Sequence, residues 1–183
     1  GPQIEGDRFR TETLGFGFEK PAEWHFLPGS SLIDEADARV EDRAELWRRL
    51  HKPALTPLVG IASAPEPRTG RDAIALVHAI PARANESDFA LDLLKNTPLV
   101  DAVHTFAHAR TGPNPSFQVA APSVAAPFDI GEGAFIDVRY DGEEGPTYER
   151  ITALRRGSQF WYVRVMVPDP VDAANQVWLD SLA

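Results

Sequence analysis

His104 and His108, with Asp101 nearby, are the residues whose types and spacing most clearly suggest chemistry. On a helix, side chains four apart share a face, so two imidazoles and a carboxylate could hold a metal ion. On a strand the two histidines would lie about 13 Å apart, too far to share an ion. The short run 103–110, bounded by a Gly-Pro pair, favours a strand. We therefore expect no metal site and no cofactor here.

Other patterns typical of enzymes are missing from the sequence. It contains no G-x-S-x-G elbow, no phosphate-binding P-loop and no cysteine. Gly15 and Gly17 fall in a strand-like stretch without a following helix, which indicates packing and not nucleotide binding. Acidic pairs such as Glu143-Glu144 fall on expected turns or helix faces, where they are normally solvated. We expect a protein that is not an enzyme, with a hydrolase using His104 or His108 as an alternative.

The charge and composition of the chain exclude some classes of binding partner. The 183 residues include 27 acidic and 18 basic side chains, a net charge of -9, which argues against nucleic acid because phosphate binding needs clustered Lys and Arg. No run approaches the roughly 20 apolar residues that span a bilayer. Gly1-Pro2 resembles a stub left by a protease, which suggests that a leader or lipid anchor was removed. We expect a flexible N-terminal segment or tag remnant at 1–8 and a single domain at 9–183.

The hydrophobic periodicity of the sequence predicts the strands and helices that would position these residues. Alternation indicates strands and a spacing of three and four indicates helices. In the first half of the chain we expect strands at 8–13, 15–18, 58–63 and 72–80 and helices at 34–51 and 85–94. Residues 58–63 and 72–80 could form a hairpin.

Trp47 and Leu50 lie on the apolar stripe of the expected helix 34–51. Core packing is the first interpretation of a buried tryptophan. If this helix docks loosely, the two side chains line a groove for a partner, because tryptophan is enriched at binding hot spots. They are the candidate partner-binding residues.

The C-terminal third predicts an antiparallel meander closed by a helix. Strands are expected at 134–140, 148–155 and 159–167, the last with Trp161, Val163, Val165 and Val167 on one face. Asp169-Pro170 is a candidate N-cap for a helix reaching residue 181. The proline-rich segment 112–127 is expected to be a loop with one edge strand near Phe117. The order of elements predicts an antiparallel α+β fold.

Several segments resemble PsbP-like domains. Residues 15–24, GFGFEKPAEW, resemble the opening strand and bend of this family. Residues 131–140 look like its glycine turn and long strand, 160–165 like its aromatic final strand, and 169–182 like its closing helix. The resemblance implies a central antiparallel β-sheet flanked by helices on both faces, and a role in binding. The chain departs from the pattern at 34–51 and 112–127, and no functional residue is carried over.

Members of that family include photosystem extrinsic subunits, a Ran-binding nuclear import factor, bacterial envelope lipoproteins and secretion chaperones. The resemblance implies a non-catalytic binding protein of the bacterial envelope, periplasmic or secreted, whose partner is a protein or a hydrophobic ligand. The alternative from a different class is a cytoplasmic secretion chaperone or adaptor. A scaffold shared by such different proteins does not by itself identify the partner.

Overall fold

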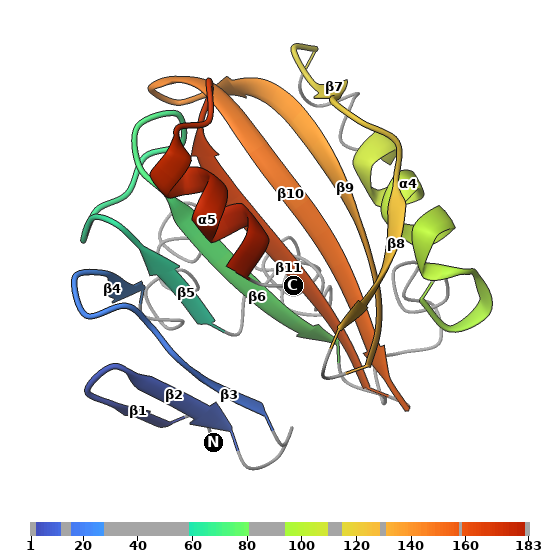
Figure 1. The fold of residues 1–183 in the computed structure, drawn as a ribbon, viewed down its shortest axis with the longest axis horizontal. Coiled ribbons are helices and arrows are strands. Elements are labelled where there is room, and N and C mark those ends of the chain that lie inside the picture. The colour runs from blue at the N-terminus through green and yellow to red at the C-terminus, as the bar shows by residue number, and fades with distance from the viewer. Residues whose placement is uncertain are drawn as a thin grey trace, which may run out of the picture.

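The computed structural model describes residues 3–11, 16–27, 59–80, 94–109, 115–128, 131–157 and 159–181. Within these ranges an eight-stranded antiparallel sheet has the order β4-β5-β6-β11-β10-β9-β7, and β8 also pairs with β9 (Figure 1). Its strands are β4 (His25–Leu27), β5 (Val59–Ala62), β6 (Ile74–Ile80), β7 (Gln118–Val119), β8 (Val124–Phe128), β9 (Gly131–Gly142), β10 (Gly145–Arg156) and β11 (Gln159–Pro168).

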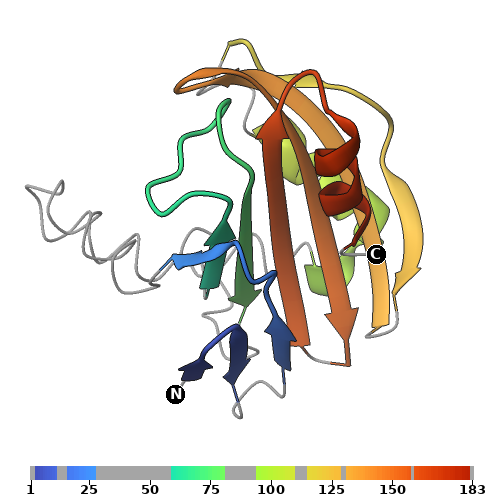
Figure 2. The same cartoon turned by 60° about the vertical axis from the view of Figure 1, so that its left-hand side comes forward.

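The N-terminal strands form a separate three-stranded sheet. It contains β1 (Gln3–Glu5), β2 (Arg8–Thr11) and β3 (Phe16–Glu19), and lies at one end of the large sheet in Figures 1 and 2. Gly6, with φ 60°, makes the β1–β2 turn, so a hairpin occupies part of the segment 1–8 expected to be flexible. A Cβ on Gly17 would lie 2.9 Å from the Phe9 carbonyl oxygen, which explains this glycine by packing.

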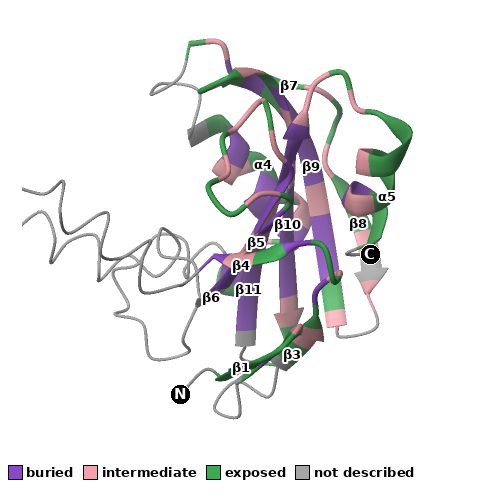
Figure 3. Cartoon of the chain, turned by 90° about the vertical axis from the view of Figure 1, so that its left-hand side faces the viewer, coloured by how far each residue is buried: buried purple, intermediate pink, exposed green. Residues whose placement is uncertain are grey.

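The long meander β9–β10–β11 is the centre of the fold, and its antiparallel pairing is as expected. The hairpin of β5 and β6 also forms, and β6 joins the meander through β11. Figure 3 shows that buried residues are concentrated along these long strands. Alternation along them sends successive side chains to opposite faces, so two sets of buried side chains arise.

The first set, on what we call the α4 face, includes Ile136, Ile151 and Phe160 and packs against helix α4 (Leu99–Ala109). The second, the α5 face, includes Val163 and Val165 and packs in part against helix α5 (Ala173–Ser181). The mostly antiparallel sheet is confirmed. Flanking by helices on both faces is not confirmed as a feature of the fold, because each of these short helices covers only part of the sheet.

The expected strand 103–110 is wrong, because residues 103–109 belong to helix α4. In this helix Leu99, Ala102, Val103 and Ala107 are buried at helical spacing. The carbonyl of Pro98 accepts hydrogen bonds from the amides of residues 101 and 102 and begins the helix. The apolar stripe of the helix starts at Leu99, before the segment 103–110 that predicted a strand. The segment by itself is too short to show the helical period.

The terminal helix and the proline-rich segment also differ in detail from what the sequence predicts. Helix α5 begins at Ala173, and its N-cap is Asp172, whose Oδ1 accepts a hydrogen bond of 2.7 Å from the Asn175 amide. The segment 112–127 contains β7, the expected edge strand, and most of β8, which was not expected. The expected helix 34–51, with Trp47 and Leu50, and nearly all of 85–94 lie outside the described residues.

Candidate functional site

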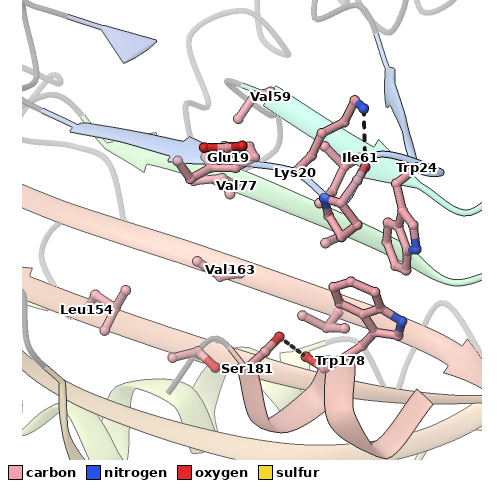
Figure 4. Close-up of a pocket in the computed structure, with 15 residues that line it drawn as sticks. Glu19, Lys20, Trp24, Val59, Ile61, Val77, Leu154, Val163, Trp178 and Ser181 are labelled. Atoms are coloured by element: carbon pink, nitrogen blue, oxygen red, sulfur yellow. Dashed lines mark hydrogen bonds between the residues drawn. The ribbon is translucent and has the colours of Figure 1, made fainter. Parts of the chain in front are cut away.

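A cavity of about 620 Å³ lies between the α5 face, helix α5 and the segment that joins β3 to β4 (Figure 4). Its floor comes from four adjacent strands. Val59, Val77, Val163 and Thr152 form one row across β5, β6, β11 and β10. A second row contains Ile61, Ala75 and Val165. The floor is apolar except for the Thr152 hydroxyl.

The shape of the floor follows from its short side chains. Valine, alanine and threonine stand roughly perpendicular to the sheet and reach only a short distance above it. Val59, Val163 and Val165 expose 5% or less of their surface, so the floor is shielded from solvent. Longer side chains, including Leu154, Phe18 and Trp178, also line the cavity. The arrangement leaves volume above the middle strands.

Two tryptophans form one wall of the cavity. Trp24 lies at the end of a turn in which its amide donates to the Pro21 carbonyl, at 3.1 Å. Its indole ring lies 4.3 Å from that of Trp178 on α5, centroid to centroid, at an interplanar angle of 47°. Figure 4 shows the two rings next to each other. Trp24 is buried and Trp178 half-buried, so the pair closes the gap between the turn and the helix.

The charged residues among the described lining side chains are Lys20 and Glu19. The Lys20 side chain is 8% exposed, and its Nζ lies 2.5 Å from Asp7 Oδ1 and 3.2 Å from the Pro21 carbonyl oxygen. Glu19 has 67% of its side chain exposed and pairs with Arg8 at 3.9 Å. The Ser181 hydroxyl donates to the Trp178 carbonyl at 3.1 Å. These charges are therefore paired within the protein or directed to solvent.

Arg150 links helix α5 to the sheet through hydrogen bonds and ion pairs. Its guanidinium lies 2.8 Å from Asp137 Oδ1 on β9, and its Nη1 donates to the Leu179 carbonyl at 3.2 Å and to Asp180 at 3.1 Å. The hydrogen bond with Asp137 raises the pKa of Arg150. Burial, and then the hydrogen bond to Asp137, raise the pKa of Tyr148 to about 12. The buried Asp137 carboxylate thus accepts hydrogen bonds from the Tyr148 phenol and from Arg150, the arginine that binds α5.

A second ionic cluster lies on the α4 face, away from the cavity. Glu149 is fully buried, accepts a 2.7 Å hydrogen bond from the Tyr140 hydroxyl and lies 2.9 Å from Arg164 Nη2. Burial opposes the charge on Arg164, but the charge of Glu149 and its hydrogen bonds outweigh burial and raise the pKa of Arg164. The paired charges satisfy each other, which is the arrangement expected of a structural ion pair.

His104 and His108 lie on α4, and their ring centroids are 4.2 Å apart. The separation of about 13 Å expected on a strand is therefore wrong, because the helix brings the rings together. Both histidines and Asp101 are exposed. Within the described part of the chain, no three His, Cys, Asp or Glu residues are grouped so as to hold a metal ion.

The sequence does not predict the cavity. Of its lining residues, Val163 and Val165 are predicted correctly on one face of β11. The cavity forms only where segments far apart in the chain come together.

No helix within the described ranges combines the length and hydrophobicity needed to cross a lipid bilayer.

Comparison with known proteins shows the fold. No protein-family model matches the sequence, and no curated protein matches it. The solution structure of cyanobacterial PsbP from Synechocystis is similar, with a TM-score of 0.56 and 10% identity over 96% of this chain and 87% of that chain. PA94, a Pseudomonas aeruginosa protein of unknown function, gives a TM-score of 0.43 and 13% identity over 66% of this chain and 78% of its own. The structure has a PsbP-like fold, as the resemblance in the sequence implied.

Proposed function

We propose that this protein is a non-catalytic binding protein that holds a hydrophobic ligand in the cavity beside Trp24 and Trp178. The observation that carries the proposal is the cavity of about 620 Å³ with its floor of valine, isoleucine and alanine. Small-molecule sites are typically concave, mostly apolar and of about 300 to 1,000 Å³. The volume and the lining both fit that class of site.

The placement of the polar groups supports binding over catalysis. Lys20 is paired with Asp7, and Glu19 is largely exposed, so neither has the surroundings that favour proton transfer at an apolar substrate. The hydrolase alternative relied on His104 or His108. Both lie on α4, which packs on the α4 face, whereas the cavity opens on the opposite face. A reaction at these histidines would not use the cavity.

A cavity-filling substitution tests the proposal. Val163→Phe would place an aromatic ring in the floor, whereas Val119→Phe would place one on β7, where the native valine is 38% exposed. We expect Val163→Phe to weaken binding of the apolar dye Nile red about tenfold or more and Val119→Phe to leave it unchanged. A Val163→Phe protein that melts normally and binds the dye like the native protein would refute the site.

The expected location in the bacterial envelope stays a prediction, as does the cytoplasmic chaperone or adaptor role. An apolar cavity supports both, since either role would bind apolar groups. Fractionation of the native organism with an antibody against this chain separates them. Recovery with envelope fractions favours the first role, and recovery with cytosol favours the second.

A further inference from the structure

From the charges around the cavity we infer that it favours apolar ligands without an anionic group and discriminates against carboxylates such as fatty acids, because Lys20, the cation of its described lining, is already neutralised by Asp7. This inference rests on the proposed function, since it concerns the ligand of the same cavity. The expected ligand has an apolar body and no ionised acidic group.

Asp7 and Lys20 form an ion pair beside the cavity. Lys20 Nζ lies 2.5 Å from Asp7 Oδ1 and also donates to the Pro21 carbonyl at 3.2 Å. Its side chain is almost buried, at 8% exposure, while that of Asp7 is 43% exposed. A ligand carboxylate that recruited Lys20 would have to compete with Asp7 for it. A buried cation that already has a counterion gives little net attraction to a second anion.

The rest of the lining also disfavours an anion. Glu19 carries a negative charge at the edge of the cavity, and its 3.9 Å contact with Arg8 is between exposed groups. An ionised group buried over the valine floor would lose its hydration without gaining a partner, which is costly. The net charge of -9 adds a weak long-range repulsion of anions. An alcohol, ester or hydrocarbon avoids all three penalties.

The width of the floor indicates the length of the ligand. The row from Val59 to Thr152 crosses four neighbouring strands. With strands about 4.8 Å apart, this row is about 14 Å wide. An extended alkyl chain of about ten carbons has a similar length. Decyl compounds that differ only in the head group are therefore suitable probes.

The experiment measures displacement of Nile red from the native protein at pH 8 by 1-decanol and by decanoate. We expect decanol to compete about tenfold or more better than decanoate. Decanoate that competes as well as decanol would overturn the inference while the proposed function stands. If Nile red itself does not bind, the proposed function fails.

The variant Asp7→Asn tests whether the Asp7–Lys20 pair causes the discrimination against carboxylates. It keeps the shape of the side chain but leaves Lys20 without its counterion. Lys20 keeps its hydrogen bond to the Pro21 carbonyl, and a thermal melt identifies the temperature range in which the variant is folded for the binding assay. We expect decanoate affinity to rise about tenfold in Asp7→Asn, with decanol affinity unchanged. The matched control is Glu143→Gln, which removes an exposed carboxylate that is paired with Arg68 and is not part of the cavity lining. An unchanged preference for decanol over decanoate in a folded Asp7→Asn protein would overturn the role given to the Asp7–Lys20 pair.

Discussion

The indole rings of Trp24 and Trp178 lie 4.3 Å apart and link the turn after β3 to helix α5, two segments from opposite ends of the chain. In helix α5, Leu179 is buried, whereas Val177 and Ala174 are exposed. The helix therefore depends on few contacts, and the tryptophan pair is a principal one. Because the same pair forms a wall of the cavity, stability of the helix and binding in the cavity are coupled.

Trp178→Ala should lower the stability of the protein and weaken ligand binding in the cavity. The half-buried indole packs on Trp24, and its removal should lower the free energy of unfolding by about 2 kcal/mol, less than for a fully buried tryptophan. The neighbouring Val177→Ala, at a side chain 63% exposed, should change it by less than about 0.5 kcal/mol. Urea denaturation of the three proteins measures the difference. Equal midpoints for both variants would show that the indole pair does not hold the helix.

Arg150→Met should be strongly destabilising, since it leaves the Asp137 carboxylate buried without its cation. Asp137 has 7% of its side chain exposed and Arg150 has 15%. Breaking a buried pair from one side typically costs about 3 kcal/mol or more. The control is Arg68→Met, which breaks an exposed pair with Glu143 and should cost less than about 1 kcal/mol.

The double variant Arg150→Met/Asp137→Leu completes this test. It removes both charges, so it should recover part of the stability lost in Arg150→Met. Thermal melts of the single and double variants give the comparison. A double variant less stable than the single one would mean that the unpaired carboxylate is not the source of the loss.

Tyr148 should make stability depend on pH in the alkaline range. Its pKa is raised in the folded protein from 10.0 to about 12, so the folded state binds the phenolic proton more tightly than the unfolded state. The resulting stabilisation is complete below pH 10 and is lost as the pH rises through about 12. Tyr148→Phe should therefore lose less stability than the native protein between these values. The difference between the two pH profiles isolates this residue, and parallel profiles would contradict the prediction.

His104 and His108 should bind zinc only weakly. Their rings are adjacent, but two imidazoles supply half of a tetrahedral ligand set, and the described residues group no third ligand with them. Calorimetry with micromolar zinc should show no saturable heat. A tight, saturable signal that disappears in His104→Ala/His108→Ala would instead establish a metal site on α4.

The strands of the meander could be predicted because their signal is local and long. The alternation of Trp161, Val163 and Val165 identified β11 and its buried face, and short turns fixed the pairing with β10. Helix α4 could not be identified in the same way. The alanines and histidines of its run fit either period, and the helix is selected by burial of Ala102 and Ala107 against β9 and β10, which come later in the chain.

By itself, the sequence determined the antiparallel strands, the PsbP-like order of elements and the apolar character of each strand face. The tertiary structure decided that Trp24, Val163 and Trp178 surround one cavity, and that Lys20 reaches it already paired with Asp7. The physical reason is that periodicity reports which way a side chain points, whereas a cavity is a difference between the volume enclosed by several segments and the volume their side chains fill. That difference exists only after the segments have packed together.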